Sequence, residues 1–169
     1  MMEPRPVRDS VTEYSEFALP NDANPLGHLL GGKVMHLVDI AGAMAAMRHA
    51  RRPVVTASID QMTFLHPVHI GQLVLLRSSV NRVFRTSMEV GVKVFMEDLT
   101  TGVQKHTSSA YVTFVAIDKA GRPAELPPVI PQTGDEKRRY EEAGRRRQYR
   151  LEQRDRARGG TRTSPVPEV

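Results

Sequence analysis

The sequence contains no cysteine among its 169 residues. This absence excludes thiol nucleophiles, thiolate zinc sites, iron–sulfur clusters and disulfide scaffolds. Long apolar runs are also missing, because the longest stretch without an acidic or basic residue, 61–76, still holds two His, a Pro and a Gly. We therefore expect no membrane-spanning segment. The start of the sequence, MMEPRPVRDS, lacks the apolar core of a secretory signal peptide, so we expect none.

Motifs common in other enzyme classes are absent as well. The sequence has no G-x-S-x-G, H-E-x-x-H or G-x-G-x-x-G. His66 and His69 have H-x-x-H spacing but flank a proline, without a third ligand at a recognisable spacing, so we expect no metal site. Residues 27–34 have the glycine and lysine spacing of a phosphate-binding loop, but Val34 replaces the Ser or Thr that binds Mg²⁺. We therefore do not expect a nucleoside triphosphatase.

Charge is present but unevenly distributed. The formal net charge is +5, yet residues 1–131 contain 13 Lys+Arg against 12 Asp+Glu, whereas residues 132–169 contain 11 against 7. A nearly neutral body with a basic tail argues against a nucleic-acid-binding core, so we expect no nucleic-acid partner.

The order of predicted elements indicates an α+β fold. Ala, Met and Leu predict one helix over residues 30–51, and its apolar residues are not confined to one stripe, which indicates burial on most sides. A short strand is predicted before it, over residues 15–19. Four more strands follow the helix, over residues 54–64, 73–84, 88–97 and 103–117, the first with a bulge near Asp60 and Gln61. Short connections make these strands antiparallel, so we expect a curved antiparallel sheet wrapped around the helix.

The composition changes after Pro131. Residues 134–158 have helical composition and few apolar residues, which predicts an exposed helix, and residues 159–169 are predicted to be disordered. We therefore divide the chain into a domain over residues 1–130 and a basic helical tail over residues 131–169. We expect the tail to decorate the surface, where its charge could attract an anionic ligand.

Three residues of the predicted helix could carry chemistry. Gly31 and Gly32 stand at its start, where unpaired amides at the positive end of the helix dipole can polarise a carbonyl or hold an anion. Asp39 follows about two turns later among apolar neighbours. The residues alone leave two interpretations of Asp39 open. The first is structural, an ion pair to another element or a hydrogen bond to His36, and the second is a general base or nucleophile.

The run from Pro20 to Asp39, P-N-D-A-N-x-x-G-x-x-x-G-G-x-x-x-x-x-x-D, closely resembles the hot-dog-fold acyl-CoA thioesterases of the YciA and brain acyl-CoA hydrolase type. Further matches are Met62-Thr63-Phe64 with Pro67 and Gly71, Arg85-Thr86-Ser87, and Phe114-Val115-Ala116. The resemblance covers about residues 10–130 and leaves out the tail.

The resemblance implies a hot-dog fold and a catalytic role for Asp39, which would attack the thioester or activate a water. Asn24 would position that water or the substrate, although by itself it could be only a turn residue. The amide near Gly32, beside Gly31, would polarise the thioester oxygen. In such folds the site lies at a dimer interface, so Asn24 and Asp39 would come from different protomers.

The resemblance also implies a place for coenzyme A, since its pantetheine and nucleotide portions would lie near Arg85, Thr86 and Ser87. Arg85 could equally be a solvated hairpin charge. Many relatives have a histidine immediately before the paired glycines, where this chain has Leu30, so a histidine cannot act there.

We therefore predict a cytoplasmic acyl-CoA thioesterase of fatty acid metabolism, without metal or cofactor and without a membrane partner. By the same resemblance it would be a homo-oligomer of dimers, three of them forming a hexamer. Two alternatives stay open. One is a non-catalytic acyl-CoA-binding sensor, and the other is an enoyl thioester hydratase or dehydratase in which His36 would join the acid.

Overall fold

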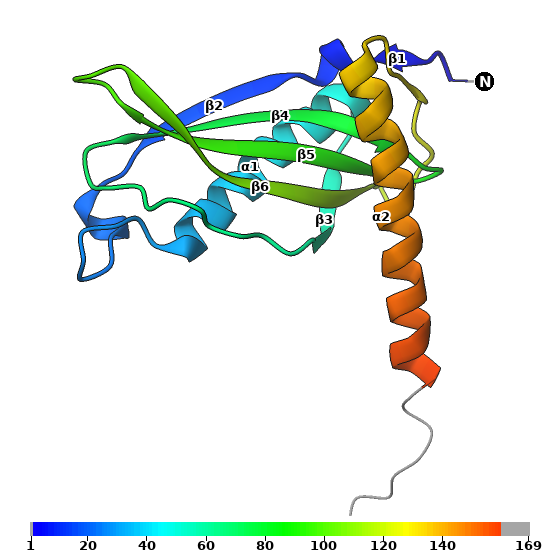
Figure 1. The fold of residues 1–169 in the computed structure, drawn as a ribbon. Helices are drawn as coiled ribbons and strands as arrows, with labels where there is room; N and C mark the ends of the chain where they lie inside the picture. Colours follow the sequence, from blue (N-terminus) through cyan, green and yellow to red (C-terminus); the bar gives the residue numbers. More distant parts are fainter. Residues whose placement is uncertain (1, 160–169) are drawn as a thin grey trace, which may run out of the picture.

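The fold is a five-stranded antiparallel sheet with one long helix on each face, as Figure 1 shows. The structure is a computed structural model, and it describes residues 2–159. The predicted α+β class and the curved sheet wrapped around a helix are confirmed. The disorder predicted for the end of the chain falls almost wholly outside the described residues. No helix in the described part of the chain is long and apolar enough to cross a membrane.

The sheet has the strand order β2-β4-β5-β6-β3, and all neighbours are antiparallel. Its strands are β2 (Thr12–Phe17), β3 (Val54–Ile59), β4 (Leu73–Val83), β5 (Ser87–Asp98) and β6 (Val103–Ala116). The first predicted strand starts earlier than expected. β3 ends before the predicted residue 64, and its bulge lies between Thr56 and Ser58 rather than near Asp60. β2 and β3 form the two edges.

Helix α1 (Gly31–Ala50) confirms the predicted helix and packs on the inner face of the sheet. It ends at Arg51, which adopts the left-handed conformation with φ 54°. Its buried side chains recur every three or four residues, so only one stripe is buried. Met35 and Met47 are 42% and 48% exposed. The prediction that the helix is buried on most sides is therefore wrong for a single chain, because one sheet can cover only one side of it.

The two faces of the sheet differ because side chains alternate along each strand. On β5, Met88, Val90 and Val92 point toward α1 and are fully buried apolar residues. The intervening Glu89 is also fully buried, on the outer face. A buried carboxylate needs a partner, and the second helix provides it.

Helix α2 (Gly134–Gly159) lies across the outer face (Figure 1). A capping box starts it, because Glu136 N donates to Thr133 Oγ1 and Thr133 N donates to Glu136 Oε2. Most of its side chains are exposed, as predicted, but one face is not. Ala143 is fully buried, and Arg146 reaches Glu89. The tail helix therefore packs on the sheet instead of only decorating the surface.

Four short elements complete the fold. β1 (Arg5–Pro6) pairs in parallel with β7 (Val129–Ile130), which ties the first residues to the segment before α2. The single-turn helices η1 (Val7–Ser10) and η2 (Pro20–Asp22) flank β2.

Candidate active site

Asn24 lies in the loop between η2 and α1 and forms an Asx turn. Its Oδ1 accepts hydrogen bonds from the amides of Leu26 and His28, at 3.0 and 3.1 Å, and Gly27 adopts φ +77°. The turn-forming interpretation of Asn24 is thus confirmed. Its side-chain nitrogen makes no hydrogen bond to any described residue, so this donor can still bind a ligand.

Lys33 fixes this loop against α1 and β2. Its Nζ lies 2.7 Å from Glu16 and 3.2 Å from Asp22. The hydrogen bonds from Lys33 and then from the Tyr14 hydroxyl hold the pKa of Glu16 below its usual value. Glu16 therefore stays ionised, and the loop that carries Asn24 is held at the start of α1.

The start of α1 is open to a ligand. The first backbone bond of the helix runs from Val34 N to Leu30 O at 3.1 Å, so helix geometry leaves the amides of Gly31 and Gly32 without an acceptor. Leu30 offers no side-chain cap, and no acid lies in the first turn. A Cβ added at Gly32 would meet nothing within 4 Å. An oxyanion could therefore approach these amides closely.

Asn24 and Gly31 line one cavity of about 330 Å³. Its walls are mostly apolar or imidazole groups. They come from the loop before α1, from α1 itself, from β6 and from the connection between β3 and β4, which includes Phe64, His66 and Val68. Asp39 does not line this cavity. One copy of the chain therefore does not bring Asn24 and Asp39 together.

Asp39 is half-buried and accepts a 2.6 Å hydrogen bond from the hydroxyl of Thr56. Within residues 2–159, Asp39 makes no ion pair and no hydrogen bond with His36. The structural interpretation of Asp39 therefore named the wrong partners, because the hydrogen bond comes from Thr56. Thr56 lies on edge strand β3 and was missed by sequence reasoning. No local motif marks it, because it meets Asp39 only through the packing of β3 against α1.

Arg85, Thr86 and Ser87 lie around the turn between β4 and β5. The Arg85 side chain is 83% exposed, and its only ion-pair partner in the described part of the chain is Glu125, at 3.9 Å. The interpretation of Arg85 as a solvated charge therefore fits the single chain. Ser87 lines a second cavity together with residues of α2. The predicted site residues thus occupy three separate places in one chain.

A long helix on the inner face of a curled antiparallel sheet, with open glycine amides at its start, is the arrangement of a hot-dog thioesterase. The thioesterase superfamily profile matches residues 26–103. An uncharacterized acyl-CoA thioester hydrolase of Bacillus subtilis, YkhA, is 40% identical over 134 residues, covering 79% of this chain and 78% of the relative. The chain therefore belongs to the thioesterase superfamily and is a thioester hydrolase.

Solved structures give the same family. The crystal structure of an apo, hexameric acyl-CoA thioesterase has a TM-score of 0.86 at 41% identity, covering 90% of this chain and 97% of that one. Residues 10–130 make up less than 90% of this chain, so the structural similarity to that thioesterase extends into α2. The acyl-CoA hydrolase of Staphylococcus aureus, solved with butyryl coenzyme A and coenzyme A, has a TM-score of 0.85 at 31% identity, covering 92% and 95%.

Three variants of the Staphylococcus aureus hydrolase have also been solved, with TM-scores of 0.86, 0.88 and 0.82 to this chain. They carry alanine in place of an aspartate, an asparagine and a threonine. The sequence intervals between those three positions equal the intervals between Asp39, Asn24 and Thr56 here.

Proposed function

We propose that this chain hydrolyses acyl-CoA thioesters to a fatty acid and coenzyme A, with Asp39 as the general base or nucleophile. The observation that carries this proposal is the hydrogen bond from Thr56 to Asp39, since it involves two residues whose spacing matches positions altered in the Staphylococcus aureus hydrolase. Thr56 occupies one carboxylate oxygen and leaves the other as a proton acceptor.

As a base, Asp39 would take a proton from a water whose oxygen attacks the thioester carbonyl carbon, and the coenzyme A thiolate would leave. As a nucleophile, it would form an anhydride that water then cleaves. In both routes negative charge develops on the thioester oxygen. The open amides of Gly31 and Gly32 are suited to stabilise that charge, because they lie at the positive end of the α1 dipole.

The complete site would form between two copies of the chain. In one copy, Asn24 lines the cavity at the start of α1 and Asp39 does not. The face of α1 that carries Met35 and Met47 is exposed, and such an apolar face is typical of a contact between subunits. A second copy would supply both a cover for this face and the missing Asn24. The hexameric assembly of the relative is the arrangement we propose here, and a cytoplasmic location remains a prediction.

Release of free thiol from a panel of acyl-CoAs tests this function. Asp39→Asn keeps the size of the side chain but removes the base, so we expect kcat/KM to fall about 100-fold to 10,000-fold. Thr56→Val removes only the hydrogen bond and should lower kcat/KM about 10-fold. His36→Ala is the matched control on the same helix, and its rate should equal that of the unaltered chain.

Other outcomes would favour the alternatives. Full thiol release by a folded Asp39→Asn variant would refute the catalytic assignment. Tight acyl-CoA binding without turnover by the unaltered chain would identify a sensor. Hydration of crotonyl-CoA without thiol release, lost in His36→Ala, would identify a hydratase.

A further inference from the structure

A second cavity, of about 340 Å³, lies on the outer face of the sheet beside α2. The sheet contributes residues from three strands, among them Ser58 of β3, Ser87 of β5 and Thr113 of β6. α2 contributes Arg147 and Arg154, which lie about two turns apart, with Arg150 between them. We call this space the α2 cavity.

The α2 cavity has positive charge that the protein does not neutralise. Arg150 is paired, since it lies 2.7 Å from Asp60 and 3.5 Å from Glu89. Arg147 has no carboxylate partner within residues 2–159, and its guanidinium lies 4.5 Å from the centre of the Phe84 ring. Among the described residues, Arg154 has only the exposed Asp155 as an ion-pair partner, at 3.7 Å. Two guanidinium groups therefore remain able to bind an anion.

The wall opposite these arginines is lined with hydroxyl groups. The Thr113 Oγ1 atom is buried and makes no hydrogen bond among the described residues. The hydroxyls of Ser58 and Ser87 have no hydrogen-bond partner there either. A buried hydroxyl without a partner is unfavourable, and an acceptor inside the cavity would satisfy it. Guanidinium forks facing hydroxyl donors match the chemistry of phosphate oxygens.

We propose that the α2 cavity binds nucleotide phosphates, and that these belong to the coenzyme A portion of the substrate. The assignment to coenzyme A rests on the proposed function. Ser87 links the cavity to the substrate, because it ends the Arg85-Thr86-Ser87 segment expected near coenzyme A and also lines this cavity. Under this proposal the basic tail helix contacts the substrate directly, instead of attracting it only from a distance.

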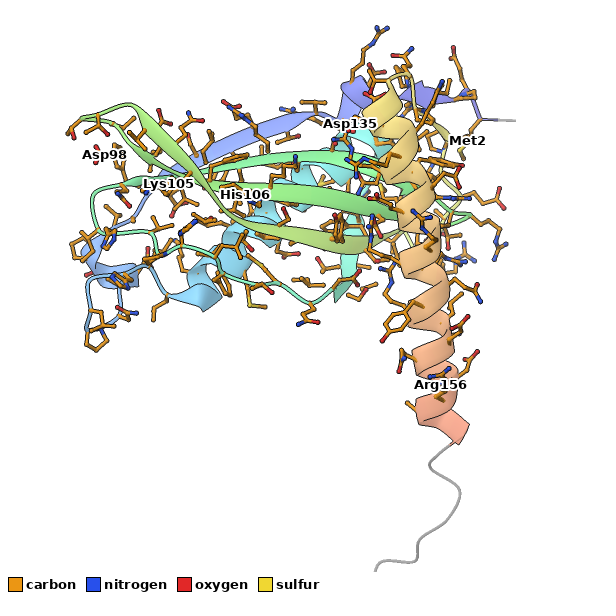
Figure 2. All side chains as sticks on the ribbon, viewed as in Figure 1. Met2, Asp98, Lys105, His106, Asp135 and Arg156 are labelled. Atoms are coloured by element: carbon orange, nitrogen blue, oxygen red, sulfur yellow. The ribbon has the colours of Figure 1, made fainter. Side chains whose placement is uncertain are left out.

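The test compares two substrates on the full-length oligomer, an acyl-CoA and the same acyl group on pantetheine, which lacks the nucleotide. Arg147→Gln and Arg154→Gln should each raise KM for the acyl-CoA about tenfold, because each removes a charged hydrogen-bond donor. KM for the acyl-pantetheine should not change. Arg156→Gln is the control, since Figure 2 places Arg156 near the end of α2, away from the sheet, and it loses the same charge.

Equal KM changes for the two substrates, or an equal effect of Arg156→Gln, would overturn the proposal in favour of structural damage or bulk charge. Calorimetry with adenosine 3′,5′-bisphosphate is an independent test. The affinity for this nucleotide should fall in the Arg147 and Arg154 variants. If it weakens while KM for the acyl-CoA stays constant, the cavity takes a free nucleotide and the coenzyme A assignment is wrong. If the unaltered chain hydrolyses neither substrate, the proposed function fails, and calorimetry alone then tests the cavity.

Discussion

The two long helices are held to the same sheet by different forces. α1 packs on the inner face through small and branched apolar side chains such as Leu37, Val38 and Ala41, all essentially unexposed. α2 packs on the outer face through the apolar side chains of Ala143 and Tyr140 and, in addition, through the ion pairs of its arginines. Hydrophobic burial depends mainly on area and is tolerant of direction, whereas an ion pair depends on geometry and on the ionisation of both partners.

Glu89 is the centre of the outer contact. It is 0% exposed, and Arg146 Nη2 lies 2.7 Å from its Oε1. Asn81 donates to the same oxygen at 3.1 Å, and the Arg146 guanidinium lies 3.6 Å from the centre of the Tyr111 ring. Part of the positive charge of the tail is therefore neutralised by a buried carboxylate of the sheet. A helix with few apolar residues can thus still be part of the folded unit when a buried charge on the sheet requires a partner.

The largest expected effect comes from breaking this ion pair. Arg146→Ala leaves Glu89 buried without its principal partner, and we expect the free energy of unfolding to fall by about 3–5 kcal/mol. Urea unfolding at fixed protein concentration measures it. Arg145→Ala, the exposed neighbour, should change it by less than about 0.5 kcal/mol. The double variant Glu89→Gln, Arg146→Met should recover most of the loss, and a failure to recover would show that other contacts of Arg146 dominate.

A glycine on each helix offers a smaller and sharper comparison. A Cβ at Gly42 of α1 would lie 3.0 Å from the ring of Phe114, which is fully buried and cannot move aside. Gly42→Ala should therefore destabilise the fold by about 1–3 kcal/mol. At Gly144 of α2 the obstacle is the end of the flexible Arg82 side chain. Arg82 would have to give up part of its contact with the Tyr140 ring, 4.2 Å from its guanidinium, and the higher helix propensity of alanine offsets that loss. Gly144→Ala should leave the midpoint of thermal unfolding nearly unchanged. Equal destabilisation by Gly42→Ala and Gly144→Ala would contradict this expectation.

The smallest expected effect is a pH dependence confined to the α1 side. Burial holds the pKa of His49 below its usual value near 6.5, although its Nε2 contacts Pro127 O at 2.8 Å. Its Nδ1 is buried without a partner. The folded state thus binds fewer protons than the unfolded state, so this stability is complete above pH 6.5 and is lost as pH falls toward the folded pKa.

Urea unfolding at several pH values between about 8 and about 5 measures how the free energy of unfolding decreases. His49→Gln keeps a donor for Pro127 and should flatten the profile, because glutamine does not titrate. Arg145→Ala, which removes an exposed arginine, should leave both the level and the slope of the profile unchanged, since arginine stays charged throughout this pH range. An unchanged slope in His49→Gln would assign the pH dependence to other groups.

Much of the fold could be predicted because its signals are local. The alternation over Met88, Val90 and Val92 gave β5, and the β-branched residues after Pro53 gave β3 with a bulge. The turn over residues 118–123 is likewise local: Asp118 Oδ1 accepts from the amides of Ala120 and Arg122, and the segment contains Gly121 and Pro123. Boundaries shifted by a few residues where pairing, rather than propensity, ends a strand.

The candidate site was predicted only in part. The turn at Asn24, the open start of α1 at Gly31 and Gly32, and the position of Asp39 on the helix follow from short motifs. Thr56 does not, because its partner Asp39 lies on another element. The hydrogen bond to His36, one of the alternatives left open for that acid, is not made among the described residues. The α2 cavity was invisible in the sequence because it joins three strands and a helix.

The sequence by itself determined the elements, their order, the family and the residues able to carry chemistry, because propensity, periodicity and motif spacing act over a few neighbouring residues. Only the tertiary structure decided the strand order, the partner of Asp39 and the packing of the basic tail helix on the sheet. Glu89 and Arg146 lie 57 positions apart, and nothing near either residue specifies the other. Such pairs are selected by the free energy of burying a charge, which depends on what the finished fold places beside it.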